Sequence, residues 1–130
     1  MQHIIYIEGN TKMISWVIQT GKDKVEQSRL HPEIYLDKVT ESQSKYIALH
    51  VGLFWGIGTF SIKDNEEMTV RLDDKQMYER LTTNEKKSDE FIEKRIGFIR
   101  HLISQRNLKI QYEIISEKEN LAKKLQNTGH

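Results

Sequence analysis

The 130-residue sequence contains no cysteine, only one proline and no long apolar run. The lack of cysteine excludes disulfide bonds and thiolate metal ligands. No apolar stretch approaches the ~20 residues that a membrane-spanning helix requires. The N-terminal segment is too polar for a signal peptide. These absences predict a cytoplasmic protein without a membrane partner.

An excess of charge of either sign is also missing, because 20 Lys and Arg residues balance 19 Asp and Glu residues to a net charge of +1. This balance neither requires nor excludes a nucleic-acid partner, since a local basic patch decides such binding. Hydrophobic residues make up 37% and charged residues 30%, which is typical of a globular protein. The length predicts a single domain over residues 1–126, and we expect a disordered tail at 127–130.

The first thirty residues carry three short runs with β-strand character. Their β-branched and alternating side chains predict strands over residues 3–8, 13–19 and 24–30. Residues 9–10 and 20–23 have turn composition, so the connections between these strands are expected to be tight. Three consecutive strands joined in this way predict an antiparallel meander.

Beyond Pro32, helical patterns alternate with strand patterns. The predicted elements are a helix that begins at Thr40 or Ser42 and ends by Gly58, a strand at 68–72, a short helix at 74–81, a long helix at 85–105, a strand at 108–115 and a final helix capped by Ser116. This order predicts an α/β fold with a mixed five-stranded sheet, in which the meander of three strands is joined by two parallel strands and flanked by helices.

Four local motifs, taken with this order, resemble the type 1 ribonuclease H family in its short bacterial form. The motifs are Tyr6–Asn10, Thr40–Leu49, Leu72–Leu81 and Tyr112–Leu125. The resemblance covers nearly the whole chain and implies a ribonuclease H-like fold. Active members of that family cleave the RNA strand of an RNA–DNA hybrid with two magnesium ions held by four carboxylates.

The resemblance implies that the four carboxylate positions correspond to Glu8, Lys45, Asp73 and Lys123. Two of the four are lysines, so the formal charge of the quartet is zero. An ammonium group about 4 Å from a divalent ion repels it by roughly 8 kcal/mol at an effective dielectric constant near 20. We therefore expect a degenerate active site, in which the magnesium site is lost and no cofactor is bound. Glu41, one helical turn before Lys45, is the alternative source of a carboxylate.

In this interpretation the lysine side chains replace the metal ions. Lys45 and Lys123 are expected to pair with Glu8, Asp73 and Asp74. If residual activity exists, the resemblance implies magnesium or manganese bound by Glu8, Asp73 and Asp74.

The long predicted helix carries several cations that are candidates for contact with nucleic acid: Lys86, Lys87, Lys94, Arg95 and Arg100. Acidic residues are interleaved with them, so a solvated helix face is the favoured interpretation and a phosphate-binding face the alternative. Trp16 and Trp55 are expected in the core or in an interface.

Three functional hypotheses remain open from the sequence. The first is a non-hydrolytic domain that binds nucleic acid, either an RNA–DNA hybrid or a single strand, or that binds a protein. The second is an active RNA–DNA hybrid ribonuclease that uses Glu8 and Asp73. The third is a structural subunit that dimerises through a strand edge or the long helix.

Overall fold

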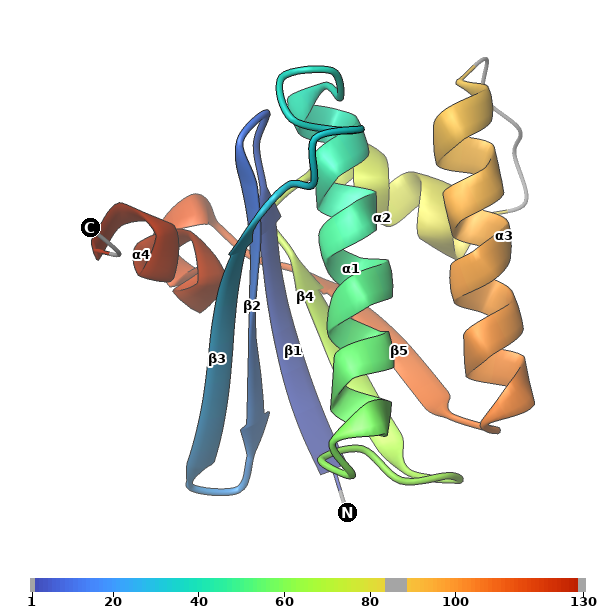
Figure 1. Cartoon of the computed structure of the whole chain (residues 1–130). Coiled ribbons are helices and arrows are strands. Elements are labelled where there is room, and N and C mark those ends of the chain that lie inside the picture. Colours follow the sequence, from blue (N-terminus) through green and yellow to red (C-terminus); the bar gives the residue numbers. More distant parts are fainter. Residues whose placement is uncertain (1, 84–88, 129–130) are drawn as a thin grey trace.

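A computed structural model describes residues 2–83 and 89–128 of the chain. Five strands form one mixed sheet in the order β3-β2-β1-β4-β5 (Figure 1). Their bounds are β1 Gln2–Gly9, β2 Met13–Thr20, β3 Asp23–Leu30, β4 Glu67–Leu72 and β5 Lys109–Ile114. Strands β1, β2 and β3 pair antiparallel, whereas β4 pairs parallel with both β1 and β5. The predicted meander, the two parallel strands and the fold class are confirmed.

The helices lie on both faces of this sheet (Figure 1). Their bounds are α1 Glu41–Gly58, α2 Lys75–Thr82, α3 Glu90–Gln105 and α4 Leu121–Thr128. Successive side chains of β1 point to opposite faces of the sheet, and each face of this strand packs against a core. Ile5 and Ile7 join the large core under α1, α2 and α3, while Tyr6 joins a smaller core with Ala122 of α4.

Polar side chains determine where the helices begin. Thr40 and Gln43 form a reciprocal capping box at the start of α1, and Asp74 and Asp89 cap α2 and α3 through their side chains. Asp89 thus marks the start of α3 at Glu90, five residues after the predicted start, and residues 84–88 lie outside the described part of the chain.

The predicted cap at Ser116 belongs to a different element. Glu119 Oε1 accepts from Ser116 N at 3.1 Å, as a capping box requires, but this contact closes the short 3₁₀ turn Glu117–Glu119. Helix α4 begins only at Leu121 and includes Asn127 and Thr128 of the expected tail.

The two tryptophans lie where a core assignment predicts. Trp16 is fully buried, and its ring centroid is 5.9 Å from that of the partly buried Trp55.

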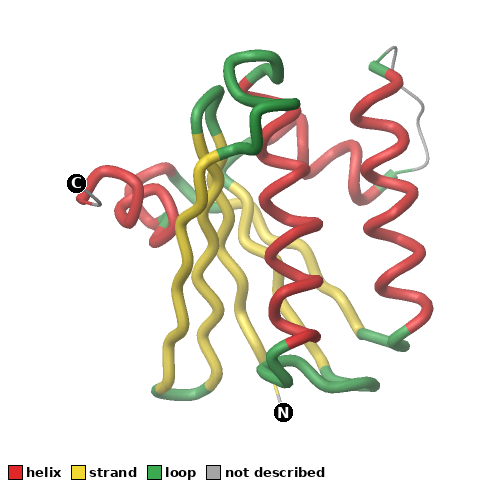
Figure 2. Tube along the Cα trace, viewed as in Figure 1, coloured by secondary structure: helices red, strands yellow, loops and turns green. Residues whose placement is uncertain are grey.

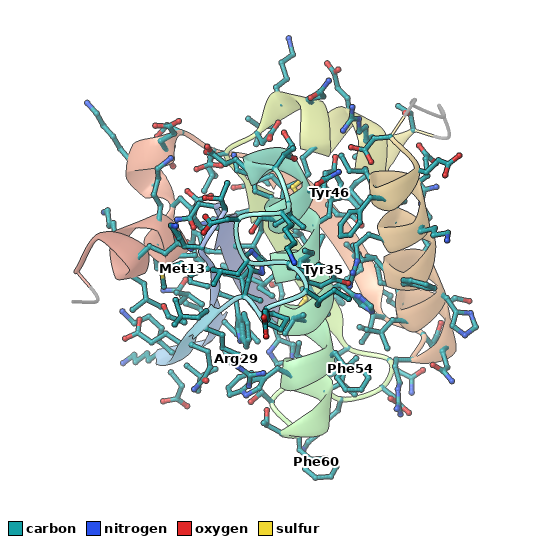
Figure 3. All side chains as sticks on the ribbon, turned by 45° about the horizontal axis from the view of Figure 1, so that its top comes forward. Met13, Arg29, Tyr35, Tyr46, Phe54 and Phe60 are labelled. Atoms are coloured by element: carbon teal, nitrogen blue, oxygen red, sulfur yellow. The ribbon has the colours of Figure 1, made fainter. Side chains whose placement is uncertain are left out.

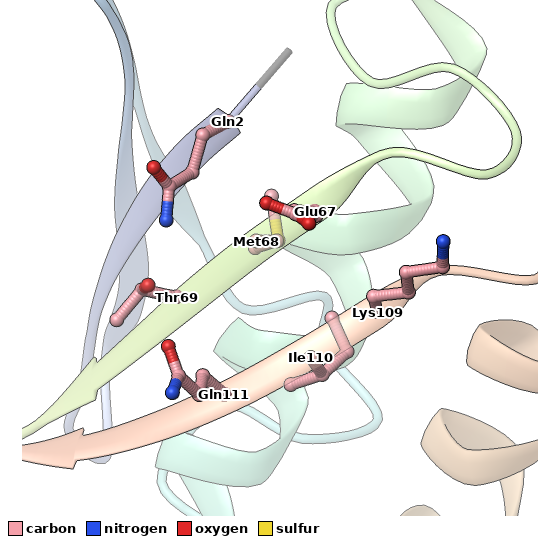
Figure 4. A pocket seen from close by; sticks show the side chains of 7 residues that line it. All are labelled: Gln2, Glu67, Met68, Thr69, Lys109, Ile110 and Gln111. Carbon is pink, nitrogen blue, oxygen red and sulfur yellow. The ribbon is translucent and has the colours of Figure 1, made fainter.

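Figure 4 shows a depression of about 240 Å³ on β1, β4 and β5. Its lining is mostly polar and consists of Gln2, Glu67, Thr69, Lys109 and Gln111, together with Met68 and Ile110. Among residues 2–83 and 89–128, no helix is long and apolar enough to cross a membrane.

Candidate functional site

The four residues Glu8, Lys45, Asp73 and Lys123 form one cluster, which we call the acid–lysine site. Glu8 lies at the end of β1, and Asp73 directly follows β4. Because β1 and β4 are parallel neighbours, their carboxyl ends meet at the same edge of the sheet. The N-terminal parts of α1 and α4 then bring Lys45 and Lys123 to this edge.

A close contact between β1 and α1 sets the position of Lys45. A Cβ atom on Gly9 would lie 2.5 Å from Ser44 Oγ, so only glycine allows α1 to approach the strand end this closely. Ser44 is itself held by His31, whose Nε2 lies 2.8 Å from Ser44 Oγ and donates to Asn10 O at 3.0 Å. The turn after β1 and the loop before α1 therefore lie at the same end of the molecule (Figure 2).

Lys45 contacts two carboxylates at the start of α2. Its Nζ lies 3.9 Å from Asp73 Oδ1 and 3.5 Å from Asp74 Oδ2. The Asp73 side chain is only 2% exposed and that of Lys45 13% exposed, so water screens this pair weakly. Asp74 also caps α2, because its Oδ1 accepts from Met77 N at 3.1 Å.

Lys123 makes the corresponding contact with Glu8. Its Nζ lies 3.3 Å from Glu8 Oε2 and 3.5 Å from Oε1 of the exposed Glu117. Burial alone lowers the pKa of Lys123, but the charges of Glu8, Asp73 and Glu117 outweigh this effect and raise the pKa above its ordinary value. Lys123 is therefore an ammonium group at neutral pH.

Asn120 is a site residue that the sequence analysis missed. It is fully buried, and its Nδ2 donates to Ile7 O at 2.9 Å and to Asp73 Oδ2 at 3.0 Å. Its Oδ1 accepts from Ala122 N at 3.0 Å at the start of α4. Hydrogen bonds of this one amide side chain therefore connect β1, Asp73 and the start of α4. The signal for it was an asparagine directly before the final helix, a common N-cap residue.

Each oxygen of the two central carboxylates faces a donor from the chain itself. Glu8 Oε1 accepts from Gly9 N at 2.9 Å, and Oε2 faces Lys123. Asp73 Oδ2 accepts from Asn120, and Oδ1 faces Lys45. Within the described part of the chain, no group of three or more His, Asp or Glu side chains is arranged to hold a metal ion. Glu41, the alternative carboxylate, is exposed at the first residue of α1.

Two of the candidate nucleic-acid contacts make hydrogen bonds inside the fold. Arg95 Nη2 donates to Tyr35 Oη at 3.0 Å, and Arg95 Nη1 lies 3.1 Å from His50 Nδ1. Burial and the nearby Arg95 charge lower the pKa of His50. Arg100 Nη2 donates to the carbonyl oxygens of Thr83 at 2.8 Å and Arg80 at 3.2 Å, at the end of α2.

The other candidate cations on this segment are Lys86, Lys87 and Lys94. Lys94 is exposed on α3. Lys86 and Lys87 lie outside the described residues. The cations of the alternative phosphate-binding face therefore differ in their surroundings, and of the three described ones, Arg95 and Arg100 contribute to tertiary contacts.

Comparison with known proteins adds fold information. No protein-family model matches the sequence. No curated protein matches it either. Among solved structures, the chain is similar to RNase H1 from the halophilic archaeon Halobacterium salinarum, with 17% identity and a TM-score of 0.77 over 98% of both chains.

Two further solved structures have the same architecture. The N-terminal RNase H domain of a Mycobacterium tuberculosis protein is 19% identical, with a TM-score of 0.78 over 96% of this chain and 95% of that one. LC11-RNase H1, solved in complex with an RNA/DNA hybrid, is 20% identical, with a TM-score of 0.77 over 95% and 92%. The chain therefore has the ribonuclease H-like fold.

Proposed function

We propose that this chain is a ribonuclease H-like domain that binds nucleic acid, with an RNA–DNA hybrid as its partner, and that does not cleave it by two-metal chemistry. The observation that carries this proposal is the pairing of Lys45 and Lys123 with the buried acids Asp73 and Glu8. The fold supports the hybrid as partner, because LC11-RNase H1 has the same fold and was solved with an RNA/DNA hybrid.

The donor set of the acid–lysine site does not fit two divalent ions. Magnesium prefers oxygen ligands in near-octahedral geometry, and the oxygens of Glu8 and Asp73 face Lys123, Gly9 N, Lys45 and Asn120. A divalent ion would have to displace both ammonium groups from carboxylates that are at most 5% exposed. The lysines supply the compensating positive charge that the acids require when they are buried.

The first experiment separates binding from cleavage. Purified protein is mixed with a labelled RNA–DNA hybrid in magnesium, in manganese and in EDTA. We expect binding in all three solutions and intact RNA in each of them. Cleavage of the RNA strand in magnesium or manganese would show that the chain is an active hybrid ribonuclease and would refute the proposal.

A second experiment tests the nucleic-acid part of the proposal through its salt dependence. Each phosphate contact made by a cation contributes about 0.9 to the slope of log K against log salt for a duplex. Replacing the exposed Lys94 by glutamine should lower this slope by about one. Lys22→Gln, in the hairpin between β2 and β3, is the matched control and should leave the slope unchanged. If neither hybrid nor single strand is retained at low salt, nucleic acid is not the partner.

A further inference from the structure

Two exposed aromatic side chains lie together on the outer side of α1 and α3, away from the acid–lysine site. Phe54 is 67% exposed and Phe98 is 54% exposed. The His50 ring stacks on Phe98, with centroids 5.8 Å apart and planes 26° apart. Together with His101, Leu102 and Gln105 these residues line a hollow of about 330 Å³, which we call the aromatic groove. Figure 3 shows Phe54 projecting outward from α1. Adjacent exposed aromatics of this kind mark interaction surfaces.

A glycine beside Phe98 adds a second, independent feature. Gly97 is exposed in the middle of α3, and apart from its two neighbours and the backbone of the adjacent helical turns, no described atom lies within 4 Å of the position that its Cβ would take. Glycine in a helix interior is less stable than alanine, so contacts within the chain do not explain this residue. The surface of α3 therefore carries the exposed ring of Phe98 next to Gly97, which has no side chain.

We propose that the aromatic groove binds a second copy of this chain, with the two α3 helices antiparallel about a two-fold axis between Gly97 and Phe98. A two-fold interface requires a surface that complements itself. Rotation about this axis places Phe98 of each copy over Gly97 of the other, because the exposed ring and the glycine are neighbours. Glycine at that point allows the two helices to approach closely.

The charge distribution along α3 favours the same antiparallel arrangement. Asp89 and Glu90 lie at the start of the helix, and Arg106 lies at its end. The antiparallel pairing brings the acidic start of each helix beside Arg106 of the other, which also lies 3.7 Å from Asp64 of its own chain, and it opposes the two helix dipoles. A parallel pairing would place like charges together at both ends.

The dimer leaves the acid–lysine site accessible. Phe54 follows Lys45 by nine residues on α1, which corresponds to about 14 Å along the helix axis. The paired molecule would therefore present two such sites, each able to contact nucleic acid. Lys94 lies one helical turn before Phe98 on the same face of α3, so the effect of Lys94→Gln on hybrid binding is measured at protein concentrations at which the chain is a single copy.

Sedimentation velocity of the whole chain over a concentration series tests the proposal. We expect the mass of wild type to rise from one chain toward two as its concentration increases, and Phe98→Asp to remain a single chain throughout. Phe60→Asp is the matched control, because Phe60 is 79% exposed on the loop after α1 and has φ of 63°, a conformation that aspartate tolerates. This control should dimerise like wild type.

Gly97→Leu separates the interface from the stability of the helix. Leucine is a better helix former than glycine, so the thermal midpoint should stay the same or rise. The bulky side chain should nevertheless weaken dimerisation at least about tenfold in Kd. If wild type has the mass of one chain at protein concentrations up to about 1 mM, a second copy does not bind the aromatic groove. Undiminished dimerisation of Gly97→Leu or of Phe98→Asp would also overturn it.

Discussion

Lys123 Nζ lies 3.3 Å from Glu8 Oε2, and the Glu8 side chain is only 5% exposed. An acid buried to this degree is stable only while a cation or several hydrogen bonds compensate its charge. Lys123 supplies that charge from α4, at the far end of the sequence from Glu8. The ion pair is therefore part of what attaches α4 to the sheet.

Removing one member of this pair should cost more than removing both. Lys123→Met leaves Glu8 with an uncompensated charge and should lower the free energy of unfolding by about 2 kcal/mol. The double variant Glu8→Gln, Lys123→Met should recover part of this loss, because the buried charge is gone. Urea unfolding of wild type, the two single variants and the double variant measures the coupling. Additive losses would show that the two side chains act independently.

Replacing both lysines by acids should create a metal site. Lys45→Glu with Lys123→Asp places four carboxylates at one edge of the sheet, and such a set requires divalent cations for charge compensation. Calorimetric titration with magnesium or manganese should detect binding at about 1 mM or tighter in this variant and none in wild type.

A control with the same change in net charge is Lys22→Glu with Lys109→Asp, in which both exposed lysines lie away from the acid–lysine site. It should bind no more metal than wild type. Two-site binding of micromolar strength by wild type itself would contradict the idea that the lysines replace the ions.

The protein should lose stability at alkaline pH. Burial raises the pKa of Tyr112 to about 12 from an ordinary value of 10.0, although Arg100 acts in the opposite direction. The unfolded state therefore releases this proton at lower pH than the folded state. The stability due to Tyr112 is complete below pH 10.0 and is lost as the pH rises toward about 12.

Lys123 acts in the same direction, because its pKa is raised above 10.5 by the acids around it. Urea unfolding between pH 9 and pH 12 measures the combined effect. In Tyr112→Phe, the free energy of unfolding should decrease by about 2 kcal/mol less than in wild type over this pH range. An identical slope in Tyr112→Phe and wild type would exclude Tyr112 as a cause.

Arg100 and Lys94 should differ in what they affect, although both are cations on α3. Arg100→Gln removes the donor that contacts the carbonyl oxygens of Thr83 and Arg80, and it should lower the free energy of unfolding by about 1 kcal/mol. Lys94→Gln should leave stability within about 0.5 kcal/mol of wild type. Thermal unfolding and hybrid binding of both variants check this assignment; equal stability of the two variants would show that the Arg100 contacts contribute nothing.

The meander of β1, β2 and β3 was predictable because local patterns specify it. The β-branched and apolar runs of β1 and β2 and the two-residue turn at Gly21-Lys22 indicate the meander without any long-range information. The resemblance then placed Glu8, Lys45, Asp73 and Lys123 in one pocket. The contacts of the two lysines with the acids follow that expectation, whereas the role assigned to them stays a prediction.

Other features depend on contacts between distant segments. Neither Arg95 nor Arg100 differs in local sequence from a solvated arginine, and only packing reveals that one meets Tyr35 and the other caps α2. The start of α3 was misplaced because the sequence before Asp89 is equally compatible with a helix. Asn120 was missed since its partners, Ile7 in β1 and Asp73 after β4, are distant in the sequence.

The long separation in sequence between Asn120 and Ile7 has a consequence for folding during synthesis. Asn120 follows Ile7 by 113 residues, so the ribosome needs on the order of 6–20 s to reach it after the first strand has emerged. Throughout that interval the nascent chain carries Glu8 without Lys123, and later Asp73 without Asn120, although Lys45 is synthesised before Asp73. The contacts that attach α4 to Glu8 and Asp73 therefore form only after the last part of the chain has been synthesised.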